Sequence, residues 1–258
     1  MRRIVGASLP TFVADSRAAA EQVLADEIVT LLRARPGAVL GLATGSSPVG
    51  VYRALCDSHA NGIVSFADVT TFNLDEYLGL PDGHPHTFRR WMMEHLFEHV
   101  QPGRAFLPEH HGTSATVDAT AAAYERAIGK AGGLDLQVLG IGLNGHIGFN
   151  EPGSTRDSRT RVVELHPETR TGAVRTFGDI DRVPTHAISM GVATILDARC
   201  VRVLAFGRDK ADIVRRTLLD PVSADCPATF MRGHPDVKLY LDVEAAALVD
   251  DAAARPRV

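Results

Sequence analysis

Four short polar segments of the chain carry residue types that can move protons and hold an anion. They are residues 44–47, 73–77, 142–151 and 207–210. Each follows a run of apolar residues that is typical of a buried strand. Because ligands of open parallel sheets bind beyond the carboxyl ends of the strands, we expect the four segments to meet in one site.

The first segment has the composition of a phosphate-binding turn. Small side chains let backbone N–H groups approach an anion, and the helix expected after Pro48 adds partial positive charge. The segment lacks the Gly-Lys-Ser/Thr of a nucleotide-binding loop, which favours a phosphomonoester. An ordinary capped turn is the alternative, since Ser-Pro often opens a helix. The residues concerned are Thr44, Gly45, Ser46 and Ser47.

Two further segments carry single charged candidates. Asp75, just past a strand, could abstract a proton next to a carbonyl group, although a solvated turn is the simpler interpretation. Lys210 lies at a strand-to-helix junction and could reach a phosphate as a point charge. Taken alone, it is more simply a solvated lysine at a helix start.

The segment 142–151 offers a histidine between an amide and a carboxylate. His146 can transfer a proton near neutral pH, and Glu151 could orient its ring. Residues 140–145 also fit the dinucleotide pattern G-x-G-x-x-G, but that pattern must open a helix. Because Pro152 and Gly153 follow closely, the stretch is expected to be a loop and no nicotinamide or flavin site is predicted.

Composition narrows the class of protein. The 258 residues are 45% hydrophobic and 22% charged, with a net charge of −4, so no basic surface for nucleic acid or an anionic membrane is indicated. Three widely spaced cysteines without a C-x-x-C pair favour a reducing cytoplasm. No apolar run approaches the roughly 18 residues of a membrane helix. His95 and His99 lack a third ligand, so no metal site is predicted.

The elements that must position these residues alternate along the chain, which predicts a single α/β domain over residues 1–258 with a mostly parallel sheet covered on both faces. The polar segment 155–185 is predicted to be a mobile lid. Strands are expected at 38–43, 69–73, 105–107, 134–141, 160–165, 185–190 and 200–206, and helices at 16–33, 47–60, 87–99, 115–131 and 208–219.

Taken together and in this order, the four segments resemble the glucosamine-6-phosphate deaminase family, which is also called the glucosamine/galactosamine-6-phosphate isomerase family. The resemblance covers roughly residues 10–240. Its most specific strings are N-x-D-E-Y and N-G-H-I-G-F-N-E-P. The matching stretches are LGLATGSSPVGVYRAL, VTTFNLDEYLGL, LGIGLNGHIGFNEPGS, SRTRVVEL and FGRDKA.

The resemblance implies a Rossmann-like open sheet and the cofactor-free conversion of glucosamine 6-phosphate to fructose 6-phosphate and ammonia. It implies that Asp75 is the base, that His146 assists ring opening and that Glu151 is its acidic partner. Arg175 and Lys210 match the cations that accompany the phosphate loop. A homo-oligomer is compatible with this family, and no nucleic acid or membrane partner is implied.

The chain departs from the enteric form of the family at several positions. Asn144 replaces an aspartate of the histidine relay, and we expect the amide to orient the ring. Phe88 replaces a tyrosine near the substrate. Val163 and Glu164 replace a lysine and a threonine of an allosteric site, so activation by N-acetylglucosamine 6-phosphate is not expected. Three other functions stay open: a galactosamine-6-phosphate deaminase, a 6-phosphogluconolactonase-like hydrolase and a non-enzymatic sugar-phosphate sensor.

Overall fold

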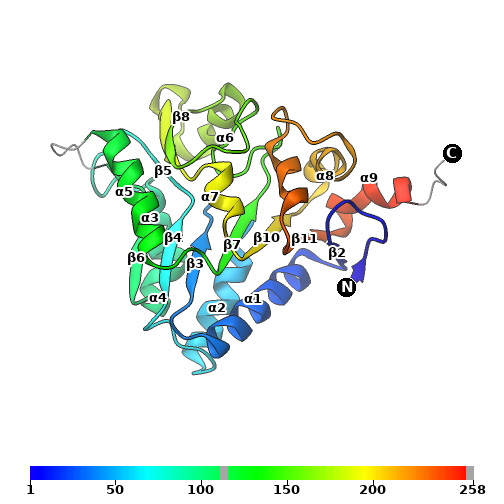
Figure 1. Ribbon diagram of the computed structural model, residues 1–258, viewed down its shortest axis with the longest axis horizontal. Coiled ribbons are helices and arrows are strands. Elements are labelled where there is room, and N and C mark those ends of the chain that lie inside the picture. The colour runs from blue at the N-terminus through cyan, green and yellow to red at the C-terminus, as the bar shows by residue number, and fades with distance from the viewer. Residues whose placement is uncertain (111–115, 254–258) are drawn as a thin grey trace.

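The computed structural model describes residues 1–110 and 116–253. Its centre is an eight-stranded sheet in the order β1-β2-β11-β10-β7-β3-β4-β6 (Figure 1). Every neighbouring pair is parallel except β1 and β2. The strands are β1 (Arg2–Arg3), β2 (Thr11–Ala14), β3 (Val39–Leu42), β4 (Thr70–Asn73), β6 (Arg104–Phe106), β7 (Leu136–Gly140), β10 (Cys200–Ala205) and β11 (Val237–Asp242).

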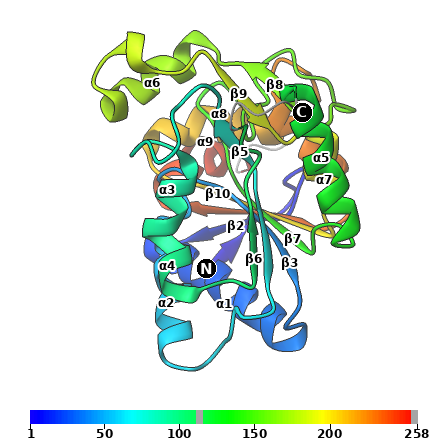
Figure 2. The same cartoon turned by 90° about the vertical axis from the view of Figure 1, so that its left-hand side faces the viewer.

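Helices cover both faces of this sheet, with α3 and α4 on one side and α5 and α7 on the other in Figure 2. A π-helical turn, η1, joins α3 to α4 into one continuous helical segment. The helices are α1 (Arg17–Ala34), α2 (Val49–Ala60), α3 (Phe88–Met92), η1 (Met93–Phe97), α4 (Glu98–Val100), α5 (Val117–Lys130), α6 (Pro167–Phe177), η2 (Ile180–Arg182), α7 (Val192–Leu196), η3 (Arg208–Lys210), α8 (Ala211–Leu219), η4 (Pro227–Gly233) and α9 (Val243–Ala253).

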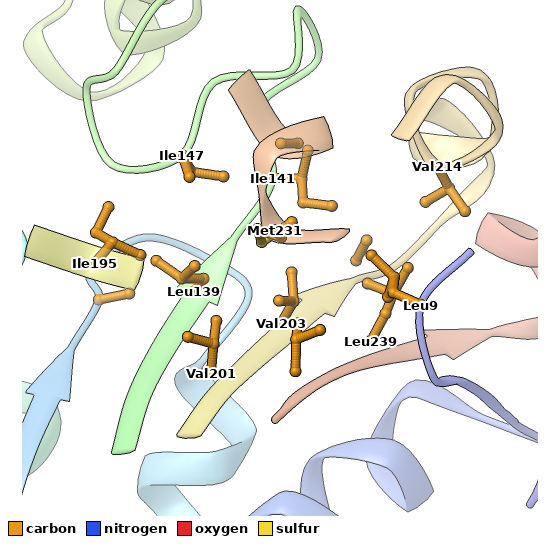
Figure 3. Close-up of a cluster of buried hydrophobic side chains, with 14 of the residues drawn as sticks. Leu9, Leu139, Ile141, Ile147, Ile195, Val201, Val203, Val214, Met231 and Leu239 are labelled. Carbon is orange, nitrogen blue, oxygen red and sulfur yellow. The ribbon is translucent and has the colours of Figure 1, made fainter. Parts of the chain in front are cut away.

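Two apolar layers hold the helices to the sheet. On one face, β-branched and leucine side chains of the central strands pack under α5, α7, α8 and α9. Figure 3 shows this layer, in which strand residues face side chains from α7, α8 and η4: Leu139, Val201, Val203, Leu239, Ile195, Val214 and Met231. The other face packs against α1, α2 and the helical segment 88–100. Strands buried on both faces are typical of a parallel sheet.

A second, antiparallel sheet lies beyond the main one, with the order β5-β9-β8. Its strands are β5 (Asp75–Tyr77), β8 (Arg161–Glu164) and β9 (His186–Ser189). Asp75 pairs with Ser189, which in turn pairs with Arg161. Figure 1 shows β8 and α6 at the top of the molecule, away from α1 and α2.

The structure confirms the α/β class, the mostly parallel sheet and the predicted strands, with one correction. The strands predicted at 160–165 and 185–190 do not extend the parallel sheet; they form the small antiparallel sheet instead. No intervening helix separates β4 from β5, and Leu74 alone lies between them. Because a parallel neighbour needs a long crossover, the chain here turns into a separate sheet.

No helix among residues 1–110 and 116–253 is long and apolar enough to cross a bilayer.

Candidate active site

All four polar segments line one pocket of about 520 Å³. Each segment contributes at least one lining residue: Ser46, Asp75, His146 and Lys210. Helix α6 adds Arg175. A wider outer cavity of about 1090 Å³ shares several of these lining residues and opens beside α1. Convergent polar groups in a concave pocket at the carboxyl ends of parallel strands are typical of a ligand site.

The turn between β3 and α2, which is predicted to bind phosphate, lines the end of the pocket that the outer cavity shares. Gly45 has a φ of +88°, a conformation that a side chain would disfavour. Pro48 provides no side-chain cap at the start of α2, where the N–H of Gly50 donates to Glu21 Oε1 at 3.3 Å. Thr44 and Ser47 line the same wall. The backbone and not the side-chain charge of this turn therefore dominates its contribution.

Two cations face this turn. The Lys210 Nζ atom donates a hydrogen bond to the carbonyl oxygen of Ile141 at 2.8 Å, at the end of β7. Burial lowers the pKa of Lys210; Asp209 acts against this effect and Arg175 adds to it. Because Arg175 is an exposed residue on α6 and Lys210 belongs to η3, the two charges come from different elements.

The part of the pocket that the outer cavity does not share, here called its inner end, holds a buried carboxyl group. Asp75 on β5 is 6% exposed. Burial raises the pKa of Asp75 to about 8, and the neighbouring charge of Glu76 adds to the shift. The segment 142–151 passes closely over it, because a Cβ on Gly148 would lie 3.5 Å from the Asp75 Oδ2 atom. A carboxyl group with such a pKa is a stronger base than an ordinary aspartate once it loses its proton.

Glu76 faces away from Asp75 and holds the start of α3. Its Oε1 atom accepts the N–H groups of Tyr77 at 2.8 Å and Phe88 at 2.9 Å. Its Oε2 atom accepts the N–H group of Arg89 at 2.9 Å. Burial raises the pKa of Glu76 while these backbone bonds lower it. The side chain thus ties β5 to the wall of the pocket that carries Phe88.

His146 lies against a carboxylate on the loop after β7. Its Nδ1 atom is 3.3 Å from Glu151 Oε2, a charged pair when the ring is protonated. Gly142 makes room for the ring, since a Cβ there would lie 2.2 Å from its Cε1 atom. Burial acts to raise the pKa of Glu151, but the contact with His146 and hydrogen bonds from Thr169 and Asn144 lower it to about 2.

Asn144 differs from the expectation drawn from the resemblance. Its Oδ1 atom accepts the backbone N–H of His146 at 3.1 Å, and its Nδ2 atom donates to Glu151 Oε2 at 2.8 Å. No hydrogen bond links the amide to the imidazole ring. The amide therefore orients the loop and the carboxylate, and reaches the ring only through Glu151.

Several contributors to the pocket are absent from the sequence-based prediction. Thr169 on α6 donates a hydrogen bond from its hydroxyl to Glu151 Oε1 at 2.6 Å. Arg17 on α1 donates to the carbonyl oxygen of Ser46. Thr169 lies in the predicted lid segment and Arg17 in a predicted helix, but no local signal of the sequence marks either residue as a partner of the site.

Aromatic rings line the wall between the two ends of the pocket. The ring of Tyr77 lies 4.7 Å from that of Phe88, 5.7 Å from that of Phe149 and 5.4 Å from that of Phe177, measured between centroids. These contacts join β5, α3, the loop after β7 and the end of α6. They surround the approach to Asp75 with low-polarity groups, in keeping with its raised pKa.

Within the described part of the chain, no cluster of three or more histidine, cysteine, aspartate or glutamate side chains could hold a metal ion.

Comparison with known proteins identifies the family. The model of the family described as glucosamine-6-phosphate isomerases/6-phosphogluconolactonase matches residues 14–239. Glucosamine-6-phosphate deaminase of Rhodopirellula baltica is 45% identical over 243 residues, which cover 93% of this chain and 96% of that protein. A solved monomeric glucosamine-6-phosphate deaminase has a TM-score of 0.87 and 39% identity, covering 92% of this chain and 99% of its own.

A 6-phosphogluconolactonase from Trypanosoma cruzi shares the fold, with a TM-score of 0.73 and 22% identity over 92% of this chain and 95% of its own. Identity at this level carries the fold alone. Because the family model matches most of the chain and the relatives align along nearly their whole length, this protein belongs to the glucosamine-6-phosphate isomerase/6-phosphogluconolactonase family.

Proposed function

We propose that the protein converts glucosamine 6-phosphate to fructose 6-phosphate and ammonia. The observation that carries the proposal is one pocket with a cationic, backbone-lined end at 44–47 and a buried base, Asp75, at the other. A phosphorylated amino sugar offers matching groups at its two ends. Relatives named glucosamine-6-phosphate deaminase, at 45% identity, support the same substrate.

The phosphate end would fix the sugar before any bond changes. Backbone N–H groups of the turn, together with Lys210 and Arg175, would bind the phosphate oxygens. Lys210 would then exchange its bond to the Ile141 carbonyl for a charge-assisted bond. Anchoring the phosphate holds the far end of a six-carbon sugar near Asp75 and His146, and such positioning removes much of the entropic cost of reaction.

Ring opening would be the task of His146. Glu151, with its pKa of about 2, remains ionised at neutral pH and stabilises a positive charge on the imidazole. The imidazole can then give its proton to the pyranose ring oxygen and take one from the C1 hydroxyl, which yields the open-chain aldehyde and restores the protonated imidazole. Asn144 and Thr169 hold the carboxylate in place during this exchange.

Isomerisation and deamination would follow at Asp75. The carboxylate removes the proton from C2 while the C1 carbonyl oxygen takes a proton from the substrate ammonium group, which gives an enolamine. Asp75 then returns its proton to C1 and leaves a protonated imine at C2. Water adds to the imine and ammonia departs, giving the 2-ketose. A substrate ammonium group near Asp75 would lower the pKa of its carboxyl group, which favours the ionised base in the complex.

The test is to measure products from three substrates in parallel without added metal. We expect ammonia from glucosamine 6-phosphate, and its release about two to four orders of magnitude slower with the Asp75→Asn variant. Greater turnover with the galactosamine epimer would reassign the sugar. Hydrolysis of 6-phosphogluconolactone without ammonia release would replace the proposal by a lactonase, whose chemistry needs no base near C2. Binding of all three sugars without turnover would identify a sensor.

A further inference from the structure

The first turn of α1 meets the anion-binding turn through one arginine. The Arg17 Nη2 atom donates to the carbonyl oxygen of Ser46, and its Nε atom donates to Glu21 Oε1 at 2.7 Å. The guanidinium carbon lies 5.2 Å from the centroid of the Phe206 ring. Arg17 also lines the outer cavity with Ser46, Ser47, Arg175 and Lys210.

These contacts require an arginine. One planar guanidinium group satisfies a carbonyl oxygen and a carboxylate with different nitrogen atoms while its face packs near a ring. A lysine could supply the charge, but its single nitrogen cannot reproduce this arrangement. The side chain of Arg17 is 41% exposed, so its fixed orientation comes from these partners and not from burial.

Glu21 links the same arginine to the start of α2. Its side chain is largely buried, and its Oε1 atom also accepts the N–H of Gly50 at 3.3 Å. Gly50 makes room for the carboxylate, since a Cβ there would lie 2.0 Å from Glu21 Oε2. Glu21 therefore places a negative charge beside a helix start that is expected to bind phosphate. Without a counter-charge, that carboxylate would repel the anion.

The bond to Ser46 also sets the direction of a peptide group. In a trans peptide, the carbonyl oxygen and the N–H of the next residue point in opposite directions. Because Arg17 binds the Ser46 carbonyl oxygen, the N–H of Ser47 is directed away from Arg17. Ser47 lines the pocket that carries Asp75 and His146.

We propose that Arg17 is a positioning residue of the phosphate site. It holds the peptide between Ser46 and Ser47 in the orientation that presents an N–H to the phosphate, and it neutralises Glu21. The inference rests on the proposed function for the identity of the phosphate ester. Independently of that identity, the inference states that Arg17 increases the affinity of the 44–47 turn for a phosphate group.

The test compares Arg17→Gln and Arg17→Lys with a matched control, Arg33→Gln, which removes an exposed arginine from the last turn of the same helix. Calorimetry gives the Kd of inorganic phosphate, and steady-state kinetics give KM and kcat for glucosamine 6-phosphate. We expect Arg17→Gln to raise Kd and KM about five- to twentyfold, the scale of one charge-assisted bond, and to change kcat less. Arg17→Lys should be intermediate and Arg33→Gln should match the wild type.

A double variant separates the two parts of the proposal. If Arg17 neutralises Glu21, Arg17→Gln combined with Glu21→Gln should bind phosphate more tightly than Arg17→Gln alone. A double variant that binds no better would contradict the neutralisation. Wild-type Kd and KM in Arg17→Gln, or an effect on kcat alone, would overturn the proposal. Melting temperatures of all variants identify any that fail to fold, and Arg17→Lys then carries the test.

Phosphate binding needs no turnover, so failure of this inference differs from failure of the proposed function. A wild-type protein that binds phosphate but releases no ammonia contradicts the function and leaves the Arg17 comparison intact. A protein that releases ammonia and is insensitive to Arg17→Gln contradicts only the inference.

Discussion

At one end of the pocket, the groups expected to hold phosphate are main-chain N–H groups and cations from three separate elements, near an open outer cavity. At the inner end, the carboxyl group of Asp75 on β5 is 6% exposed and lies near aromatic rings. The first arrangement distributes its effect over many groups that solvent and salt can reach. The second concentrates its effect in one group whose environment sets its pKa.

The two ends of the pocket should therefore respond differently to the loss of a single group. Removing one of several anion-binding groups weakens binding by a limited factor, because the others remain. Removing the proposed base should slow one chemical step by a much larger factor. Substitutions at the two ends test this difference, and their expected effects decrease in the order Asp75, Lys210, Thr169 and Glu76.

The Asp75→Asn variant should lose about two to four orders of magnitude in turnover, the usual range for the loss of a general base. Kinetics with glucosamine 6-phosphate measure this loss, and KM should change far less. Near-normal turnover would remove Asp75 from the mechanism and erase the contrast between the two ends.

The same substitution should change how stability depends on pH. Because the pKa of Asp75 is raised to about 8 in the folded protein, the stability that its protonated form provides is fully present below about pH 4. It is lost as pH rises through 8. An asparagine at this position has no charge to bury, so the melting temperature of the variant minus that of the wild type should be larger at pH 9 than at pH 6. An unchanged difference would contradict the burial of a charge at this position.

Lys210→Ala should raise KM for the phosphorylated sugar about ten- to a hundredfold while kcat falls less, since a charged contact to phosphate is lost. Lys130→Ala, at the end of α5, is the control and should leave KM unchanged. The wild-type KM should also rise with added salt, which screens exposed charges. A loss confined to kcat would mean that the phosphate is bound elsewhere.

Thr169→Val should lower kcat about three- to tenfold, the scale of one ordinary hydrogen bond, because His146 and Asn144 still contact the Glu151 carboxylate. The hydroxyl of Thr169 contributes to the low pKa of Glu151, so its loss raises that pKa and Glu151 becomes protonated at a higher pH. The acid limb of the kcat profile should therefore move to higher pH. Thr169→Ser keeps the hydroxyl and should restore the wild-type profile; equal losses in both variants would indicate a packing effect.

Glu76→Gln should have the smallest effect on chemistry. The charge of Glu76 raises the pKa of Asp75. Without that charge Asp75 loses its proton at lower pH, so the rise of kcat/KM with increasing pH should move to lower pH, by less than about one unit. The variant should also lose about 1–2 kcal/mol of stability, because an N–H at the start of α3 loses its acceptor. A kcat/KM profile that moves to higher pH would contradict the conclusion that Glu76 raises the pKa of Asp75.

Local patterns of the sequence predict five of the eight strands of the large sheet, because those strands are largely apolar segments between helices, and miss β1, β2 and β11. They do not identify β5, which has only three residues and contains two carboxylates. They also miss α6, in which threonines and Gly172 dilute the apolar pattern. The helix is held by contacts that depend on the folded chain, including the bond between Thr169 and Glu151.

The residues of the site also include some that the sequence predicts and others that it does not. Polar residues after strands can be found without coordinates, because parallel strands bring their carboxyl ends to one edge. The partners of those residues cannot. Arg17 and Ser46 are 29 positions apart, and the residues between them include most of α1 and all of β3. Nor does any sequence pattern reveal that the Asn144 amide is bonded to a carboxylate and not to the imidazole ring.

The small antiparallel sheet restricts which segments of this protein can be exchanged or deleted. The strand that carries Asp75 pairs with β9, and β9 pairs with β8, from which the chain continues into α6. Residues 155–190 are thus no detachable module. A chimaera that exchanged them for the corresponding stretch of a relative would also replace the backbone partner of the base, and a deletion would leave β5 with an unpaired edge.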